Sequence, residues 1–456
     1  MANGLRTKIL ATSRQPPTPG HHIPAFRGQL ILFLLFSSIV INCAIYAVAP
    51  VGFNNNTLIH TWDTLNLRNI YDDSWGVMRQ ALDYLTGHAP LGSNTPVYSK
   101  IFFEIGRKFQ YPLSALIPFY ILENHLDLAS AIFFTLMVVA LVLTVEIFWR
   151  QKGLPVGSVY DIGLRSVATV VAAFTFYPLV KAFTLGQIQV WLNSLFAISV
   201  LAWICGRRGI AGALLGLFVL VKPHFGLFLL WGIVRREWRF VVACMAVCIV
   251  GLGASLVIFG WRNNIDYLNV LSYISSTPES FYPNNSLGAL LNRFIGRGRP
   301  DIYDNINSDL FFPPYNAWVH AISTIGALVI LVPAIFIPLS SRDQHGIEGY
   351  CLMAVSCVVA SPIAWEHHYG VLFPVFILVY IRLLAAGGRG IAALGVLYIL
   401  ASNHLQFLNL LADSPFNFVQ NYLWFSGLGL LLFLYGLLPP GKPASRNAFA
   451  GHHDRA

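Results

Sequence analysis

The chain has 456 residues, of which 56% are hydrophobic and only 11% are charged, and its mean hydropathy is +0.62. An ordinary soluble domain is about 25% charged, so this composition excludes a soluble enzyme and predicts an all-α protein that crosses a membrane many times. The net charge of +9 follows from basic loops on one side of the membrane, so a nucleic-acid partner is not expected.

The apolar runs predict a single transmembrane domain over 28–438, after a basic leader over 1–27 and before a tail over 439–456. A bilayer core about 30 Å thick needs about 20 helical residues to cross. Residues 109–122 are short and rich in proline, so we interpret them as an interfacial or re-entrant helix. About twelve membrane helices are predicted: 28–48, 128–149, 165–184, 187–204, 209–221, 223–234, 240–260, 316–339, 349–364, 367–383, 390–402 and 419–438.

Lys and Arg residues are divided unequally between the predicted loops. With the N-terminus inside, the inner segments hold 18 of the 29, and the longer outer loops hold nine. Cytoplasmic loops carry such an excess, so both termini are predicted to be cytoplasmic in a cell-membrane protein. The outer loops are then 49–127 and 261–315. The first apolar run lacks a small-residue cleavage site, so it is not expected to be a removable signal peptide.

Unusual polar residues gather on the predicted outer side. The first loop contains DDSWGVMRQALDYLTG, in which Asp73 to Thr86 can form an amphipathic helix on the membrane surface. The turn TLGQIQ carries Gln187, and the second loop carries FYPNNSLGALLNRF with Asn285 and Arg293. Because these pieces meet at one membrane face, they are expected to form an active site on a helical scaffold.

The run GLFVLVKPHFGL lies in a short apolar hairpin between two pairs of arginines. Each arm has about a dozen residues and spans about 20 Å at most, which places Lys222 at membrane depth. Pro223 breaks the helix there, and His224 follows. A lysine at this depth is costly and usually functional, although a side chain that snorkels to the headgroups would also explain it.

The segment SPIAWEHHYG joins two apolar runs at the outer face. Its His367 and His368 could relay a proton or bind a phosphate, with Glu366 fixing the tautomer of a ring. The alternative is an interfacial polar turn with Trp365 at the headgroup level. Adjacent helical side chains point apart and the outer loops offer no acidic pair at ligand spacing, so a metal site is not predicted.

Six motifs in order resemble those of glycosyltransferase family 87, within the C-type superfamily of integral-membrane glycosyltransferases. They are DDSWGVMRQALDYLTG, KFQYPLSALIP, LGQIQ with its upstream proline, KPHFGL, NNSLGALLNRF and SPIAWEHHYG. The family commonly has Tyr-Pro-Pro at 111–113, Asn in place of Gln189 and Asp in place of Glu366, so the chain departs from it there. The resemblance implies the C-type fold and transfer of a sugar, such as mannose or a pentofuranose, from a polyprenyl-phosphate donor. The acceptor would be lipid-linked or a glycan on the outer face.

A lipid-phosphate donor is anionic, so its site needs fixed positive charge. The available cations are Lys222, His224 and Arg293. Because they can hold the phosphate, neither a metal nor a cofactor is required, and the polyprenyl-phosphate sugar is itself a substrate. Three further motif residues are expected to bind substrate: Gln187, Asn285 and Glu366.

Inverting displacement at an anomeric carbon needs a base that takes the proton of the acceptor hydroxyl. The resemblance places the catalytic Asp of the family at Asp73, fourteen residues before Gly87. An ionised Asp is also favoured at a helix N-terminus, so the alternative is that Asp72 and Asp73 only cap the helix. His367 and His368 are expected to relay the proton from Asp73 or to bind the donor phosphate.

Two other classes of function remain open at this stage. A transporter or flippase for a lipid-linked or small anionic solute would also place Lys222 on a broken helix near the bilayer midplane. The sequence shows no internal repeat and no second KPH-type break, which argues against it. A non-catalytic subunit of an envelope-synthesis complex is the third class. The two large outer loops favour the enzyme.

Overall fold

The computed structural model describes residues 39–48, 56–68, 71–87, 95–296, 312–337 and 346–438. Within these ranges the regular elements are helices, and the one pairing of extended backbone is an isolated bridge between Asn284 and Trp365. The all-α prediction is therefore confirmed for the described residues. In chain order the elements are α2 (Ile41–Val48), α3 (Thr57–Leu65), α4 (Asp73–Leu85), η2 (Ser99–Glu104), η3 (Leu113–Ala115), α5 (Leu116–Leu122), η4 (Glu123–His125), α6 (Leu126–Gln151), α7 (Val159–Phe174), α8 (Tyr177–Thr184), α9 (Gln189–Ile204), α10 (Arg208–Val219), η5 (Pro223–Gly226), α11 (Leu227–Val234), α12 (Trp238–Phe259), α13 (Trp261–Ser276), α14 (Leu287–Gly296), α15 (Ala317–Phe336), α16 (Ile347–Val359), η8 (Glu366–Val371), α17 (Leu372–Ala385), α18 (Ile391–Ser402), η9 (Gln406–Leu411), η10 (Asn417–Asn421) and α19 (Tyr422–Leu437).

Five helical segments in the described part of the chain are long and apolar enough to cross a membrane. They are α12, α15 and three composite segments that contain α6, α17 and α19. The bent pair α7 and α8 makes a sixth if it counts as one span, and α9, α10, η5 with α11, α16 and α18 are shorter apolar helices. The chain is thus a membrane protein, whereas the number of twelve crossings and the C-type fold stay predictions.

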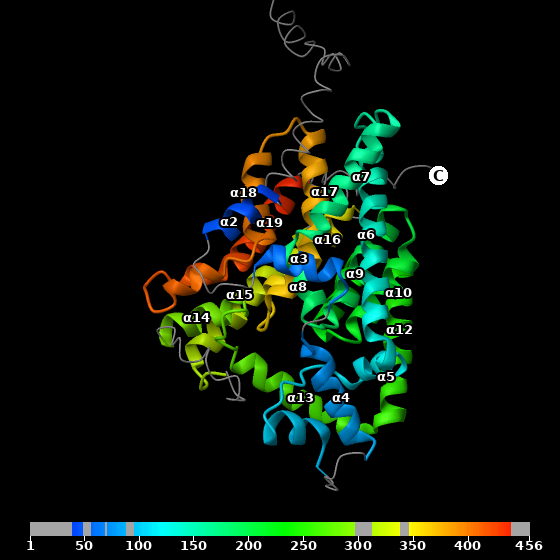
Figure 1. Ribbon diagram of the computed structural model, residues 1–456. Coiled ribbons are helices and arrows are strands. Elements are labelled where there is room, and N and C mark those ends of the chain that lie inside the picture. Colours follow the sequence, from blue (N-terminus) through cyan, green and yellow to red (C-terminus); the bar gives the residue numbers. More distant parts are fainter. Residues whose placement is uncertain are drawn as a thin grey trace, which may run out of the picture.

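The interfacial helix predicted over 109–122 corresponds to η3 and α5. These elements run on through η4 into α6, so that Leu113–Gln151 forms one helical segment of 39 residues. In Figure 1, α5 lies at the lower end of the molecule beside α4, which it contacts, and near α13. The described part of the first predicted span, 28–48, is a two-turn helix, α2.

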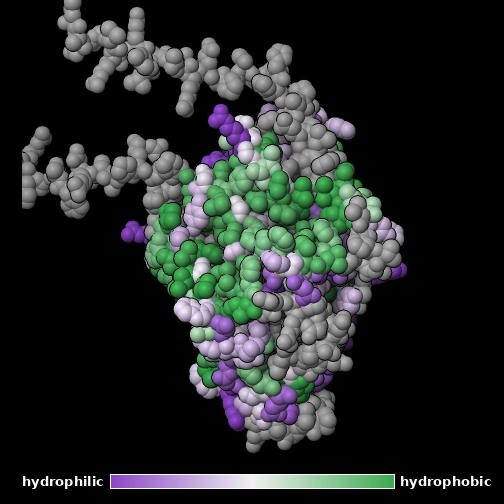
Figure 2. Space-filling view, turned by 90° about the vertical axis from the view of Figure 1, so that its left-hand side faces the viewer, coloured by the Kyte–Doolittle hydropathy of each residue, from purple (hydrophilic) through white to green (hydrophobic). Residues whose placement is uncertain are grey.

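The surface is divided between apolar and polar regions (Figure 2). Hydrophobic side chains cover a broad band over the upper half of this face, and the lower end is more polar. Exposed aliphatic residues on α12 and α15, such as Ile249, Val250 and Val329, continue the apolar surface. A surface of this extent is suited to lipid rather than water. The lower end carries α4 and α13, each of which belongs to one of the two predicted outer loops.

The predicted span 165–184 is two helices, α7 and α8, with a bend of 55° between them. A capping box between Ser158 and Asp161 begins α7. Pro178 stands in the first turn of α8, where a helix tolerates the missing N–H. Every residue of α8 is buried, because α8 contacts α3, η8 and α9. The bend thus brings Lys181, a charged side chain of α8, into the protein interior.

The hairpin predicted around Lys222 is present as α10, η5 and α11. With 12 residues, α10 is about 18 Å long, and Pro223 begins the short turn that reverses the chain. Gly212 lies against α12, where a Cβ would overlap the carbonyl group of Phe240. A glycine therefore lets the two helix backbones approach closely, as in other membrane helix pairs. Lys222 is the residue that precedes the turn.

The membrane orientation can be tested with cysteine labelling. Asp83 is exposed on α4 and Val159 is exposed at the start of α7, on loops that the charge count places outside and inside, respectively. In a background in which the exposed Cys43 and Cys205 are replaced by serine, Asp83→Cys should react with an impermeant maleimide in spheroplasts. Val159→Cys should react only after lysis. The opposite pattern would reverse the orientation and place the site inside.

Candidate functional site

The N-terminus of α4 is fixed to the turn that follows α8 by three backbone hydrogen bonds. Tyr71 N donates to Thr184 O (3.3 Å), Asp73 N to Leu185 O (3.0 Å) and Ser74 N to Gly186 O (3.2 Å). These bonds pair some of the N–H groups that a helix start leaves without partners. The outer loop is thereby attached to the membrane part at the residue before Gln187.

Gly186 makes this contact sterically possible. Its φ of +64° lies in the left-handed region, and a Cβ there would overlap the carbonyl oxygen of Tyr71 and crowd the ring of Trp75. Glycine adopts such a conformation without the steric cost that other residues incur. The Gly in the LGQIQ motif therefore sets how closely α4 approaches the turn.

The Gln187 carboxamide connects the two segments through side chains. Its Nε2 donates to the carboxylate of Asp73, and its Oε1 accepts from the hydroxyl of Ser74 and from the hydroxyl of Tyr111 (3.1 Å). Burial raises the pKa of Tyr111, so this hydroxyl stays protonated and able to donate. Because the hydroxyl donors fix the oxygen end of the amide, its NH₂ group is directed at Asp73.

The Asp73 carboxylate lines two cavities and is accessible from them. Gln187 engages Oδ2, and Oδ1 has no hydrogen-bond partner among the described residues. Desolvation by the surrounding protein raises the pKa of this carboxyl above its ordinary value, against the opposing effects of Gln187, Lys108 and Lys181. A carboxylate whose pKa is raised and which keeps one oxygen without a hydrogen bond is suited to accept a proton.

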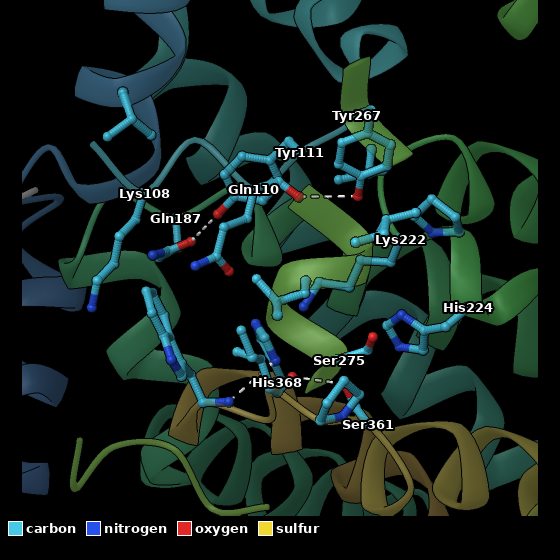
Figure 3. Close-up of a pocket in the computed structure, with 18 of the residues that line it drawn as sticks. Lys108, Gln110, Tyr111, Gln187, Lys222, His224, Tyr267, Ser275, Ser361 and His368 are labelled. Carbon is cyan, nitrogen blue, oxygen red and sulfur yellow. Dashed lines mark hydrogen bonds between the residues drawn. The ribbon is translucent and has the colours of Figure 1, made fainter. Parts of the chain in front are cut away.

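The first cavity has a volume of about 600 Å³ and lies between the loop helices and the Lys222 turn (Figure 3). Three side chains of the later motifs line this cavity: Lys222, which directly precedes η5, His224 of η5 and His368 of η8. The side chain of Lys222 is buried, and its ammonium group makes no hydrogen bond or ion pair with the described residues. Asp73 and Gln187 line the same cavity. The motifs that the sequence places more than a hundred residues apart therefore meet here.

The second cavity has a volume of about 500 Å³. It lies beside Lys181 of α8, Glu366 and His367 of η8, and the loop residue Tyr282. Four residues line both cavities: Asp73, Val77, Lys108 and Trp365. The base candidate thus borders both cavities.

The two adjacent histidines line different cavities. His368 lines the first cavity and His367 the second, with ring planes 88° apart and ring centroids separated by 4.7 Å. His368 Nδ1 accepts from Trp365 N at 3.2 Å, which orients its ring. His367 Nε2 is buried and has no hydrogen-bond partner in the described part of the chain.

Glu366 does not hold either histidine of its own motif. Its Oε2 accepts from Tyr177 OH (2.6 Å), its Oε1 accepts from Tyr422 OH (3.3 Å), and the nearest histidine nitrogen is Nδ1 of His404 at 3.6 Å. The predicted tautomer-fixing contact to His367 or His368 is therefore wrong, because the carboxylate points back into the helical core. Glu366 anchors η8 between α8 and α19.

Asn285 and Arg293 lie outside the lining of both cavities. Asn285 N donates to Ala364 O (2.8 Å), which ties the second outer loop to the segment before Trp365. The Arg293 guanidinium is buried and donates to Asn284 O (2.8 Å) and to the side chain of Asn421. The NNS and NRF residues thus hold loops together at the edge of the site.

Lys108 is a site residue that the sequence analysis did not select. It forms an ion pair with Glu279, whose other oxygen accepts from Trp365 Nε1 at 2.9 Å. Its ammonium group lies 5.6 to 5.9 Å from the ring centroids of Phe281, Phe312 and Trp365. Lys108 is the first residue of the KFQYP motif, and this position was the sequence signal that could have identified it as a site residue.

The sequence analysis also did not select Lys181, His60 and Tyr111 as site residues. Burial and the neighbouring ammonium group of Lys181 lower the pKa of His60 to about 2, so its ring is neutral. His60 Nδ1 lies 2.7 Å from Thr184 Oγ1, and Nε2 lies 3.4 Å from Lys181 Nζ.

Within the described residues, no three His, Cys, Asp or Glu side chains lie close enough together to hold a metal ion.

Comparison with known families identifies the scaffold. The profile of glycosyltransferase family 87 matches residues 109–362, which is more than half of the chain. No curated protein matches the sequence. The matched range includes Tyr111, Gln187, Lys222 and His224. Asp73 and the two histidines of η8 lie outside this range, but they line the same two cavities.

The contact at Gly186 provides a test of the site geometry. Gly186→Ala should lower activity by at least about tenfold, because the new Cβ must push α4 and Asp73 away from the turn, and an error of 1 Å can cost far more. Gly206→Ala is the matched control, since Gly206 has a φ of +74° and open space around it. Both variants place an alanine in the left-handed region, which should lower the free energy of unfolding by about 1–2 kcal/mol. Thermal unfolding measures this loss of stability. Equal activities of the two variants would contradict the close contact.

Proposed function

We propose, from the premise that the chain belongs to glycosyltransferase family 87, that it transfers a sugar from a polyprenyl-phosphate donor to a lipid-linked or glycan acceptor. The chain is a membrane glycosyltransferase by its family and its apolar helices. The sugar that we favour is mannose or a related sugar, and we place the site on the outer face of the cell membrane. The observation that supports this proposal is that Asp73 and Lys222 line one cavity.

The donor phosphate is assigned to the side of the first cavity that holds Lys222, His224 and His368. Lys222 has no carboxylate partner among the described residues, so a bound phosphate would supply the counter-charge that its buried ammonium group lacks. The two histidine rings can donate hydrogen bonds to phosphate oxygens. Since these groups can stabilise the leaving phosphate, the proposed reaction needs neither a metal nor a resident cofactor.

Asp73 is assigned as the general base of an inverting displacement. The acceptor oxygen forms a bond to the anomeric carbon as the bond from that carbon to the phosphate oxygen breaks, and its electron pair leaves with the phosphate. The acceptor proton moves to Asp73 Oδ1, the oxygen that Gln187 does not engage. The products are a glycoside and polyprenyl phosphate. Gln187 acts as a positioning residue, because it fixes the carboxylate plane through Oδ2.

The roles assigned to the remaining predicted residues differ. We assign Glu366, Asn285 and Arg293 to positioning rather than to direct contact with the substrates, since their polar groups are engaged by protein atoms. This assignment differs from the expectation that Arg293 holds the donor phosphate. Lys108 also lines the first cavity, but its ammonium group is already paired with Glu279.

Replacing the base tests the reaction class. Asp73→Asn keeps the size of the side chain and an acceptor for Gln187 but removes the group that takes the proton, which typically costs about 10² to 10⁴ in rate. We expect transfer from polyprenyl-phosphate mannose by the purified protein to fall by this factor while donor binding persists. Asp83→Asn on the exposed face of α4 is the control for charge and should retain turnover. A fully active Asp73→Asn protein would remove Asp73 from the mechanism.

The donor site is tested separately at Lys222. Lys222→Ala should weaken equilibrium binding of the polyprenyl-phosphate donor by about tenfold or more, because a charge-assisted contact is lost. Lys222→Arg should retain part of the affinity, since it keeps the charge and alters the geometry. If donor affinity is unchanged in the Ala variant, Lys222 only extends toward the headgroups.

A protein that moves the donor across the bilayer of vesicles without releasing polyprenyl phosphate would instead be a flippase.

A further inference from the structure

The two cavities meet at the proposed base from different sides. Asp73 lines both of them, and the first already contains the cations assigned to the donor phosphate. A general base must lie within hydrogen-bond distance of the acceptor hydroxyl while that hydroxyl faces the anomeric carbon. The second cavity offers the acceptor a way to reach Asp73 that does not pass the phosphate cations Lys222 and His224.

We propose that the second cavity binds the sugar headgroup of the acceptor and that His367 binds a hydroxyl group of this sugar through Nε2. The proposal rests on the proposed function, because only a transferase has an acceptor. It divides the two adjacent histidines between the two substrates, with His368 on the donor side and His367 on the acceptor side.

His367 is the side chain that points most directly to a ligand. It is only 3% exposed, and its Nε2 has no hydrogen-bond partner among the described residues, although it lines a cavity of about 500 Å³. A buried polar atom without a partner is costly, so a water, an ion or a ligand is expected to pair with it in the native site. A sugar hydroxyl can pair with either tautomer of the ring, since it both donates and accepts.

The rest of the lining also suits a sugar. Phe281, Tyr282 and Trp365 present aromatic surface on which the C–H face of a sugar ring can pack. Lys181 and Glu366 stand beside these rings and complete the mixed polar and aromatic character typical of an oriented binding site.

Lys181 is held in place from behind the cavity. Its Nζ lies 3.4 Å from Nε2 of the neutral His60, and Thr184 fixes the other nitrogen of that ring at 2.7 Å. Both carboxylate oxygens of Glu366 are engaged by Tyr177 and Tyr422, so Glu366 balances the charge of Lys181 without being free to bind a sugar. The ammonium group can therefore donate to an acceptor oxygen from a fixed position.

The test measures the two substrates separately on the purified full chain. Equilibrium binding of polyprenyl-phosphate mannose gives the donor Kd. Transfer at saturating donor into a glycolipid extract, made from membranes that lack the active protein, gives the apparent KM for the acceptor. His367→Phe replaces the imidazole with another aromatic ring and removes both nitrogens, so the acceptor KM should rise about tenfold or more while the donor Kd changes less than about twofold. His368→Phe should show the converse, a weaker donor Kd.

Two further variants separate a binding role from a packing role. His367→Gln replaces the ring nitrogen with an amide and should recover part of the acceptor affinity that His367→Phe loses. Tyr282→Leu changes a residue that lines only the second cavity, and it should raise the acceptor KM even if the His367 variants fold poorly. An unchanged acceptor KM in folded His367→Phe and Tyr282→Leu proteins would overturn the proposal, as would a donor Kd that weakens in their place. A wild-type protein that binds the donor but transfers no sugar would refute the proposed function instead.

Discussion

The docking of the α4 N-terminus on the turn after α8 is the contact on which the site depends. Three backbone hydrogen bonds join residues 71–74 to residues 184–186, and the side chain of Gln187 continues the contact to Asp73. Without this contact, a charged loop helix would lie on the membrane surface with no defined relation to the Lys222 turn. The bend of 55° between α7 and α8 is therefore as much a part of the site as the residues that line it.

A buried carboxylate supports the opposite side of the site. Glu366 is surrounded by Tyr177, Tyr422 and His404, which come from three different parts of the chain. A charge at this depth is tolerated because hydrogen bonds and nearby cations compensate the loss of water. Since η8 is held by its first residue, the next two residues are presented to separate cavities. The acid of the WEHH motif thus orients the histidines through the backbone and not through contact with their rings.

Much of this arrangement could be predicted from the sequence. Hydropathy located the apolar helices, and the amphipathic pattern after Asp73 located α4 correctly. The Pro223 break and its charged neighbour correctly marked one wall of the first cavity. These features are local, because they depend on the spacing of apolar residues and on proline within a short window.

The parts that the sequence did not reveal depend on contacts between distant segments. Lys181 is one residue in an apolar run, and only the bend before α8 turns it toward a cavity. Glu366 was expected to face the histidines beside it, but its partners come from α8 and from the chain around α19, 56 to 189 residues away. Arg293 looked like a free cation, but its guanidinium donates to Asn284 O within its own motif and to the side chain of Asn421, which is 128 residues away. Hydropathy and motif spacing carry no information on such pairings.

The way in which Asp73 is held has a consequence for how substrate preference can diversify. Its position depends on main-chain atoms of residues 184–186 and on one amide side chain, whereas the cavity walls are built largely from side chains such as Val77, Phe281, Tyr282 and Trp365. Substitutions in the walls can therefore reshape either compartment without displacing the carboxylate. With Asp73 as the proposed base, a scaffold of this kind holds the reacting group apart from the walls that would contact the substrates, so substrate preference can change while the proposed catalytic step stays the same.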